Sequence, residues 1–201
     1  MNPHHGLHAT VVFAVALLAV ARADEKAEPE KPTAHALQDI EGWTVRIDDR
    51  LLQPPHKDLG SRAIKVLAAK LADINLVVGR DRLEKLHDVT IQLDLSHGGL
   101  KAMQYHPDVG WLEEHGYDRK LVRCVHIPVA AEFLEPDTVN VQPWCVLHEL
   151  AHAYHDQVLG FDEPRIREAY EKYKKSGHGD SVLFVAGGKV RHYALTDHKE
   201  F

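Results

Sequence analysis

The 201-residue sequence predicts an α+β fold in which a small mixed sheet packs on a helix that carries an HExxH motif. Three observations indicate this class. Short β-branched runs alternate with helical spacing in the first half of the chain, and the segment around His148 has apolar residues at helical intervals. Near the C-terminus, residues 181–185 and 189–193 flank Ala186-Gly187-Gly188, which predicts a β-hairpin with a glycine turn.

The first half of the chain is predicted to run strand, helix, strand. Residues 43–47 (WTVRI) alternate in a strand-like way, whereas residues 61–72 carry apolar side chains at helical spacing. A helical turn at 83–86 leads to a β-branched run at 89–93 (VTIQL), which predicts a second strand.

A further strand is expected directly before the HExxH helix. Residues 98–120 are loop-rich, and residues 121–127 (LVRCVHI) form an apolar run that ends at Pro128. Strands in this position often lie along the cleft of zinc peptidases and pair with an extended substrate. A plain core strand is the alternative, and the sequence leaves both open.

The HExxH motif lies in a helix that could bind zinc. Four residues advance a helix by slightly more than one turn, so His148 and His152 lie on one face and can bind the same ion. Glu149 can reach a water at that ion without being a ligand. Pro143 suits the first helical turn. The chain holds 16 histidines, so two ordinary surface histidines are the alternative, but the apolar context, with no Gly or Pro from 146 to 159, favours the metal site.

Glycine and acidic residues predict where the following helices end and begin. Gly160 is expected to end the HExxH helix, and Asp162 to cap a second helix over residues 163–174. Asp197 is placed to cap a last helix.

Composition and the N-terminal segment indicate one exported domain. A net charge of −6 leaves no basic surface for nucleic acid. Residues 11–20 form an apolar run too short to span a bilayer, and Ala21-Arg22-Ala23 resembles a signal-peptidase site, so residues 1–23 predict a cleaved signal peptide. An uncleaved anchor or a buried helix is the alternative. Residues 24–41 predict a flexible leader and residues 42–201 the folded domain, in a secreted, periplasmic or extracellular protein without stable membrane insertion.

The chain has two cysteines, Cys124 and Cys145. An oxidising compartment would permit a disulfide that tethers the HExxH helix to the preceding strand. Two buried free thiols are the alternative.

The third zinc ligand is not fixed by the motif. A catalytic zinc takes three protein ligands and leaves a position for water. The extended pattern HExxHxxGxxH is absent, since His155 and Val158 occupy its Gly and third His positions. Asp162 and Glu163 are candidate ligands close in sequence, although helix capping explains them equally well.

Residues 140–201 resemble the protease domain of the anthrax-toxin lethal factor family, a gluzincin group. The family pattern is HExxH followed, after a helix and a hairpin, by a Tyr and then a Glu-Phe segment, which Tyr193 and Glu200-Phe201 match here. The resemblance implies a zincin-like fold, one Zn²⁺ ion bound by His148, His152 and Glu200, Glu149 as general base and Tyr193 as an oxyanion donor. The family continues as a helix after Glu-Phe, so the resemblance also implies that the domain is C-terminally incomplete and holds zinc less firmly.

These features predict a secreted zinc metalloendopeptidase that hydrolyses peptides or proteins, with Glu149 as the general base. The alternative is a non-catalytic exported zinc-binding or structural module on a zincin fold. Glu149 favours the enzyme, because a structural zinc site needs no general base and usually closes with four protein ligands.

Overall fold

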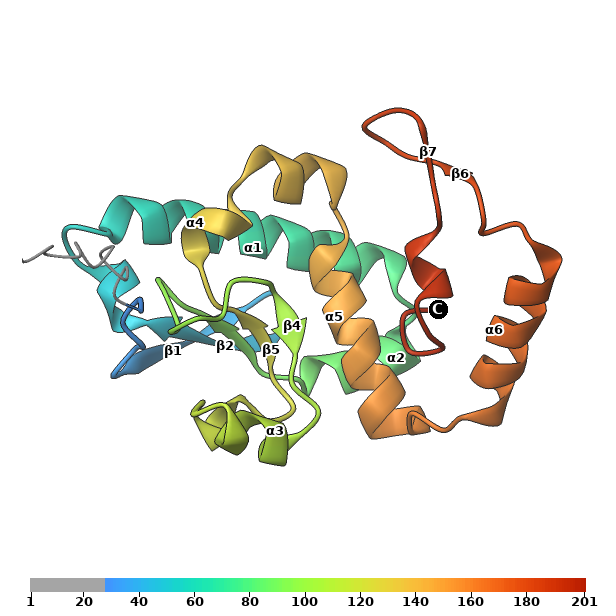
Figure 1. Ribbon diagram of the computed structural model, residues 1–201. Helices are drawn as coiled ribbons and strands as arrows, with labels where there is room; N and C mark the ends of the chain where they lie inside the picture. The colour runs from blue at the N-terminus through green and yellow to red at the C-terminus, as the bar shows by residue number, and fades with distance from the viewer. Residues whose placement is uncertain (1–27) are drawn as a thin grey trace, which may run out of the picture.

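A five-stranded mixed sheet forms the centre of the protein (Figure 1). The computed structural model describes residues 28–201, and the predicted signal peptide lies outside these residues. The strand order is β1-β2-β3-β5-β4, with parallel pairs in the middle and an antiparallel pair at each edge. The strands are β1 (His35–Ile40), β2 (Trp43–Asp48), β3 (Ile91–Leu93), β4 (Gln104–Tyr105) and β5 (Val125–Ile127). The predicted α+β class is confirmed.

The sheet begins earlier in the chain than the sequence analysis placed it. Strand β1 falls inside residues 24–41, which were predicted to be a flexible leader. It pairs with β2 in a hairpin whose two turn residues, Glu41 and Gly42, have φ values of 54° and 95°. Positive φ at both positions matches the twist of an antiparallel pair. The usual sequence signal for such a turn is Asn-Gly or Asp-Gly, and the Glu-Gly pair in this chain does not match it.

One face of the sheet is covered by the long helix α1 (Lys57–Val77), which crosses the top of Figure 1. Its buried residues Leu67, Leu71 and Ile74 recur at helical spacing and belong to one apolar cluster with Val45 and Ile91 of the sheet. Helix α2 (Arg80–His87) follows, and Trp43 donates its indole N–H to the Leu86 carbonyl at 2.8 Å. These contacts fix the sheet and the helices as one body.

Gly60 allows the first turn of α1 to pack against the 3₁₀ turn η1 (Asp49–Leu52). A Cβ at Gly60 would lie 2.0 Å from the Leu51 carbonyl oxygen. Alanine normally stabilises a helix by about 1 kcal/mol relative to glycine, but here the clash requires backbone movement. We expect Gly60→Ala to lower the free energy of unfolding by about 1–3 kcal/mol in urea titrations. Ser61→Ala at the exposed neighbouring position is the matched control, and equal stability of the two variants would contradict the packing argument.

The segment from Gly98 to Lys120, expected to be loop-rich, covers the opposite face of the sheet. It contains β4, α3 (Val109–Glu114) and the start of the 3₁₀ turn η2 (Arg119–Leu121) (Figure 1). The apolar run at 121–127 forms a strand only at Val125–Ile127, because Arg123 has a φ of 57°. Strand β5 lies between β3 and β4, so it is the core strand and β4 is the edge.

The HExxH motif lies in α5 (Cys145–Tyr154), which contacts β4 and β5. The segment α4 (Ala130–Phe133) and the π turn η3 (Asp137–Val141) precede it. Pro143 lies before the N-cap residue Trp144, so its predicted place in the first helical turn is wrong. A π turn, η4 (His155–Leu159), extends α5 to Gly160, whose φ of 81° ends the helix as predicted.

The remaining elements lie beside α5 (Figure 1). Helix α6 (Pro164–Ser176) is capped by Glu163, which accepts from the Arg165 amide, and not by Asp162, because Pro164 occupies the first helical position. The hairpin of β6 (Val182–Leu183) and β7 (Lys189–Val190) is confirmed but shorter than predicted. A 3₁₀ turn, η5 (Tyr193–Leu195), follows it. Within residues 28–201, every helix is too short or too polar to span a bilayer.

Candidate metal centre

Helix α5 directs two imidazoles at one point. The Nε2 atoms of His148 and His152 lie 3.0 Å apart, and the two rings are nearly perpendicular at 85°. This follows from their i, i+4 spacing on one helical face. Burial, and then the neighbouring His148, lower the pKa of His152. The neutral imidazole favoured in this way is the form that binds metals.

Glu200 brings a carboxylate to the same point from the C-terminal segment. Its Oε2 lies 3.2 Å from His148 Nε2 and 3.5 Å from His152 Nε2. Asp197 holds this segment, because its Oδ1 accepts from the amides of Lys199 and Glu200 at 2.7 and 3.2 Å. The helix that Asp197 was predicted to cap is not formed, because residues 196–201 are irregular, and the two hydrogen bonds of Asp197 instead position the third side chain.

The three ligand atoms have a spacing close to, and on average slightly shorter than, that of a tetrahedral zinc site. Zinc binds histidine nitrogen and carboxylate oxygen at about 2.0–2.2 Å, so adjacent ligand atoms in a tetrahedron lie about 3.3–3.5 Å apart. The three distances at this site are 3.0, 3.2 and 3.5 Å. Glu200 Oε2 is also buried without a hydrogen-bond partner. A buried oxygen of this kind needs a cation or a donor, so the group fits a metal ion.

Glu149 lies next to these ligands and outside their set. Its Oε2 accepts the Tyr105 backbone N–H at 2.7 Å, which ties the HExxH helix to the edge strand β4. Burial raises the pKa of Glu149 to about 7, and the Glu200 carboxylate contributes to this rise, whereas the Tyr105 amide opposes it. A carboxyl with a pKa in this range can both accept and return a proton near neutral pH.

Tyr193 lies near His148 in the 3₁₀ turn η5. Its ring centroid lies 6.2 Å from that of His148, and the side chain is exposed. Partial burial and the neighbouring Glu200 carboxylate raise the pKa of Tyr193, which keeps its hydroxyl protonated as a hydrogen-bond donor.

Comparisons of the chain with protein-family models, with curated proteins and with solved structures give no match.

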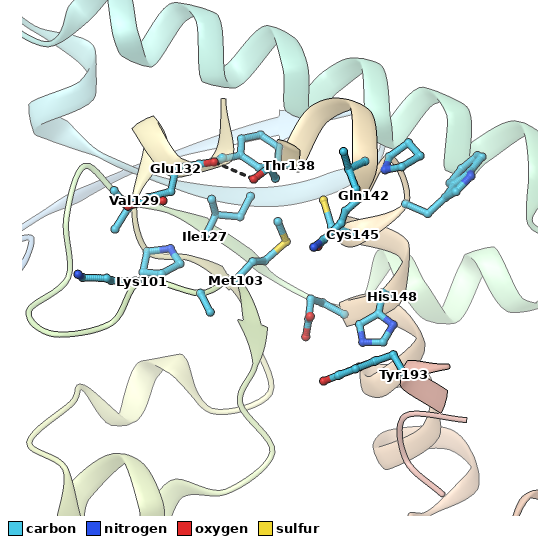
Figure 2. A pocket seen from close by; sticks show the side chains of 17 residues that line it. Lys101, Met103, Ile127, Val129, Glu132, Thr138, Gln142, Cys145, His148 and Tyr193 are labelled. Carbon is cyan, nitrogen blue, oxygen red and sulfur yellow. Dashed lines mark hydrogen bonds between the residues drawn. The ribbon is translucent and has the colours of Figure 1, made fainter. Parts of the chain in front are cut away.

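A pocket of about 960 Å³ opens beside the metal-binding side chains. Figure 2 shows His148 and Tyr193 at one end, with Met103, Ile127 and Cys145 along the wall. The Glu149 carboxyl also lines this pocket. A substrate bound in the pocket would thus lie directly against the HExxH helix.

The structure keeps the other candidate ligands away from this point. Asp162 pairs with Arg167, and Glu163 caps α6. Neither belongs to the group formed by the two α5 histidines and Glu200. Both cysteines are free thiols, so the disulfide considered above is not formed: Cys124 is buried, and Cys145 lines the pocket.

A second cluster of metal-binding side chains was not found by sequence reasoning. It consists of Asp94, His97 and His126, all buried, with ligand atoms within 4.8 Å of one another. No other histidine lies at ligand spacing from His126 in the sequence, so spacing alone does not mark it as a ligand. These residues come together only through the fold, because the parallel pairing of β3 and β5 places Gln92 beside His126.

His106 lies next to this cluster, and its buried position is expected to make the stability of the fold sensitive to acid. Burial, followed by the neighbouring His126 and His97, lowers the pKa of His106 to about 3, against about 6.5 in an unfolded chain. Below pH 6.5 the unfolded state therefore binds a proton that the folded state does not, and the fold loses stability as pH falls toward 3. We expect this group to remove up to about 2 kcal/mol of unfolding free energy between pH 6.5 and 5.

The measurement is urea unfolding at pH 7 and pH 5 for the natural chain and for His106→Gln. The variant should lose less stability on acidification, whatever its stability at pH 7. An equal loss in both proteins would show that His106 is not the group responsible.

Proposed function

We propose that the protein is an exported zinc metallopeptidase with a zincin-like fold, in which His148, His152 and Glu200 hold one Zn²⁺ ion. The observation that carries this proposal is the buried Glu200 oxygen, which has no hydrogen-bond partner and lies 3.2 and 3.5 Å from the two imidazole nitrogens. The resemblance of Tyr193 and Glu200-Phe201 to the lethal factor pattern supports the same assignment. Zinc bound here would act as a Lewis acid toward a carbonyl and lower the pKa of water.

Glu149 has the position of a general base. It adjoins the ligand His148 in sequence, lines the pocket and is oriented by the Tyr105 amide. Its carboxylate would take a proton from the attacking water and return it to the leaving amine. Retention of a free carboxylate beside a three-ligand site favours an enzyme over a structural zinc module, which normally closes with four ligands.

Strand β4 is placed to orient an extended peptide. It is the sheet edge nearest to the site, and Met103, Gln104 and Tyr105 line a cavity together with His148 and Glu149. A peptide that added to this edge as a strand would bring its backbone to the metal-binding side chains. The strand that would pair with substrate is therefore β4 and not the apolar run at 121–127, whose strand β5 lies inside the sheet.

Hydrolysis of a protein substrate tests the proposal. The purified chain should cleave casein after addition of stoichiometric Zn²⁺, lose this activity in a chelator and regain it when zinc is restored. Zinc binding without cleavage of casein or of a mixed peptide library would instead identify the non-catalytic zinc-binding module. Absence of both zinc binding and cleavage would reject the site.

Removal of the Tyr193 hydroxyl should slow turnover without releasing zinc. The hydroxyl is expected to donate to the oxyanion that forms when water adds to the carbonyl, and loss of one such donor costs about 10²–10³-fold in kcat. We expect Tyr193→Phe to lower kcat in this range and to change KM little, with zinc content unchanged. Tyr117→Phe is the control, because Tyr117 packs beside His97 and does not line the pocket that holds His148 and Glu149. An equal loss of kcat in both variants would remove Tyr193 from the mechanism.

A further inference from the structure

A buried layer of polar side chains lies on the face of the sheet opposite α1. Cross-strand pairing aligns Arg46, Gln92 and His126 in one row, and Asp94 follows Gln92 on the same face. Gln92, Asp94 and His126 are buried. A carboxylate in this position must be compensated by a cation or by several donors.

The donors around Asp94 are distributed unevenly between its two oxygens. Oδ2 lies 2.7 Å from His97 Nδ1, 2.8 Å from His126 Nε2 and 2.8 Å from Gln92 Nε2. Oδ1 receives only His35 Nε2, at 2.8 Å. Each carboxylate oxygen has two lone-pair sites, so three donors on one oxygen exceed its capacity while the other oxygen is underused. Hydrogen bonding alone explains this crowding poorly.

The rings of the two histidines beside Asp94 Oδ2 have an arrangement similar to that of the two histidines of the HExxH motif. His97 and His126 have centroids 4.7 Å apart and an interplanar angle of 79°, compared with 4.5 Å and 85° for His148 and His152. In both clusters two imidazoles meet edge to face beside one carboxylate oxygen. In the tautomers that leave His97 Nδ1 and His126 Nε2 unprotonated, these two nitrogens would offer lone pairs to an ion beside that oxygen.

We propose that Asp94, His97 and His126 form a second divalent-metal site of the zinc type, separate from the HExxH centre. The ligand atoms would be Asp94 Oδ2, His97 Nδ1 and His126 Nε2, with the two nitrogens 2.7 and 2.8 Å from the oxygen.

Neighbouring side chains orient these ligands as expected around a metal. His106 Nε2 lies 3.2 Å from His126 Nδ1, the ring nitrogen that would not bind the ion. His35 holds the second oxygen of Asp94. Metal-binding histidines usually make such a hydrogen bond through the other nitrogen, and ligating carboxylates are themselves hydrogen-bonded.

A cavity of about 580 Å³ gives access to the site, with His35, Gln92 and His97 in its wall. Lys31 and Arg46 also line it, so the charge of these side chains opposes a cation and direct ligation would have to supply the affinity. The ion would connect β3 and β5 to the segment that carries His97. We infer a structural role for the ion, because it stands apart from the pocket that contains Glu149.

Metal stoichiometry of the full chain tests this inference. After removal of metal by a chelator and equilibrium dialysis against Zn²⁺, we expect two zinc ions per chain. The variant His148→Ala/His152→Ala should retain one, and addition of His97→Gln to it should leave none. His115→Gln, an exposed histidine in neither cluster, is the control and should leave two.

The variant that lacks both α5 histidines decides the question even if changes at the buried cluster prevent folding. Retention of one zinc supports the second site, and retention of none overturns it. Co²⁺ in the same variant should give the visible absorption of a tetrahedral site with nitrogen and oxygen ligands, and an octahedral aqueous spectrum would also overturn it. Neither result depends on proteolysis, so failure of the second site leaves the proposed peptidase activity intact.

Discussion

Glu149→Gln is expected to reduce peptide hydrolysis by about 10²–10⁴-fold while zinc remains bound. Glutamine keeps the size of the side chain and can occupy the same place beside the Tyr105 amide, but it cannot accept a proton from water. The three side chains proposed to bind zinc are unchanged. Initial rates on a peptide substrate and zinc content by atomic emission, measured on the same preparation, separate the two effects.

The matched control is Glu84→Gln, a change of the same charge at an exposed position of α2. It should retain full activity. Activity of Glu149→Gln within a factor of two of the control would exclude Glu149 as the general base.

Glu200→Gln is expected to weaken zinc binding at the HExxH centre by more than 100-fold, beyond the roughly 10–100-fold loss seen when only an outer partner of a ligand is changed. The change removes the negative charge whose oxygen lies near both imidazole nitrogens. A ligand present at about 100 times its Kd stabilises the folded state by about 2.7 kcal/mol. Zinc should give the natural chain this stabilisation at that centre, and Glu200→Gln should lose it.

Thermal unfolding with and without zinc checks this expectation. Because the proposed second site would also respond to zinc, the comparison is made in chains carrying His97→Gln. Glu168→Gln, at an exposed position of α6, controls for the loss of a negative charge nearby. The same zinc-induced shift in Glu200→Gln and in the control would show that Glu200 is not a ligand.

Local sequence patterns predicted the part of the site that lies on one helix. The i, i+4 spacing of His148 and His152 fixes their common face wherever the helix packs. Placement of Glu200 depends on the course of α6 and the β6–β7 hairpin, which no spacing rule supplies. Only the resemblance to a known pattern pointed to it, and the structure brings its carboxylate to the two imidazoles.

The features that the sequence left open or did not reveal depended on pairing between distant segments. The 121–127 run was apolar, as a strand should be, but its place inside the sheet follows from the addition of β4 as an edge. The Asp94 cluster likewise combines residues from two strands and a loop. Histidines without regular spacing carry no signal until the register of β3 and β5 is known.

The chain makes a long excursion between the two side chains His152 and Glu200, which lie close together in space. These two residues are separated by 48 positions, and α6 and the β6–β7 hairpin lie between them. An ion held by both would close this long excursion into a loop, and closure of long loops by metal clips reduces the entropy of the open chain. Backbone amides of α6 should therefore exchange with deuterium more slowly in the zinc-loaded protein, while those of α1 change little.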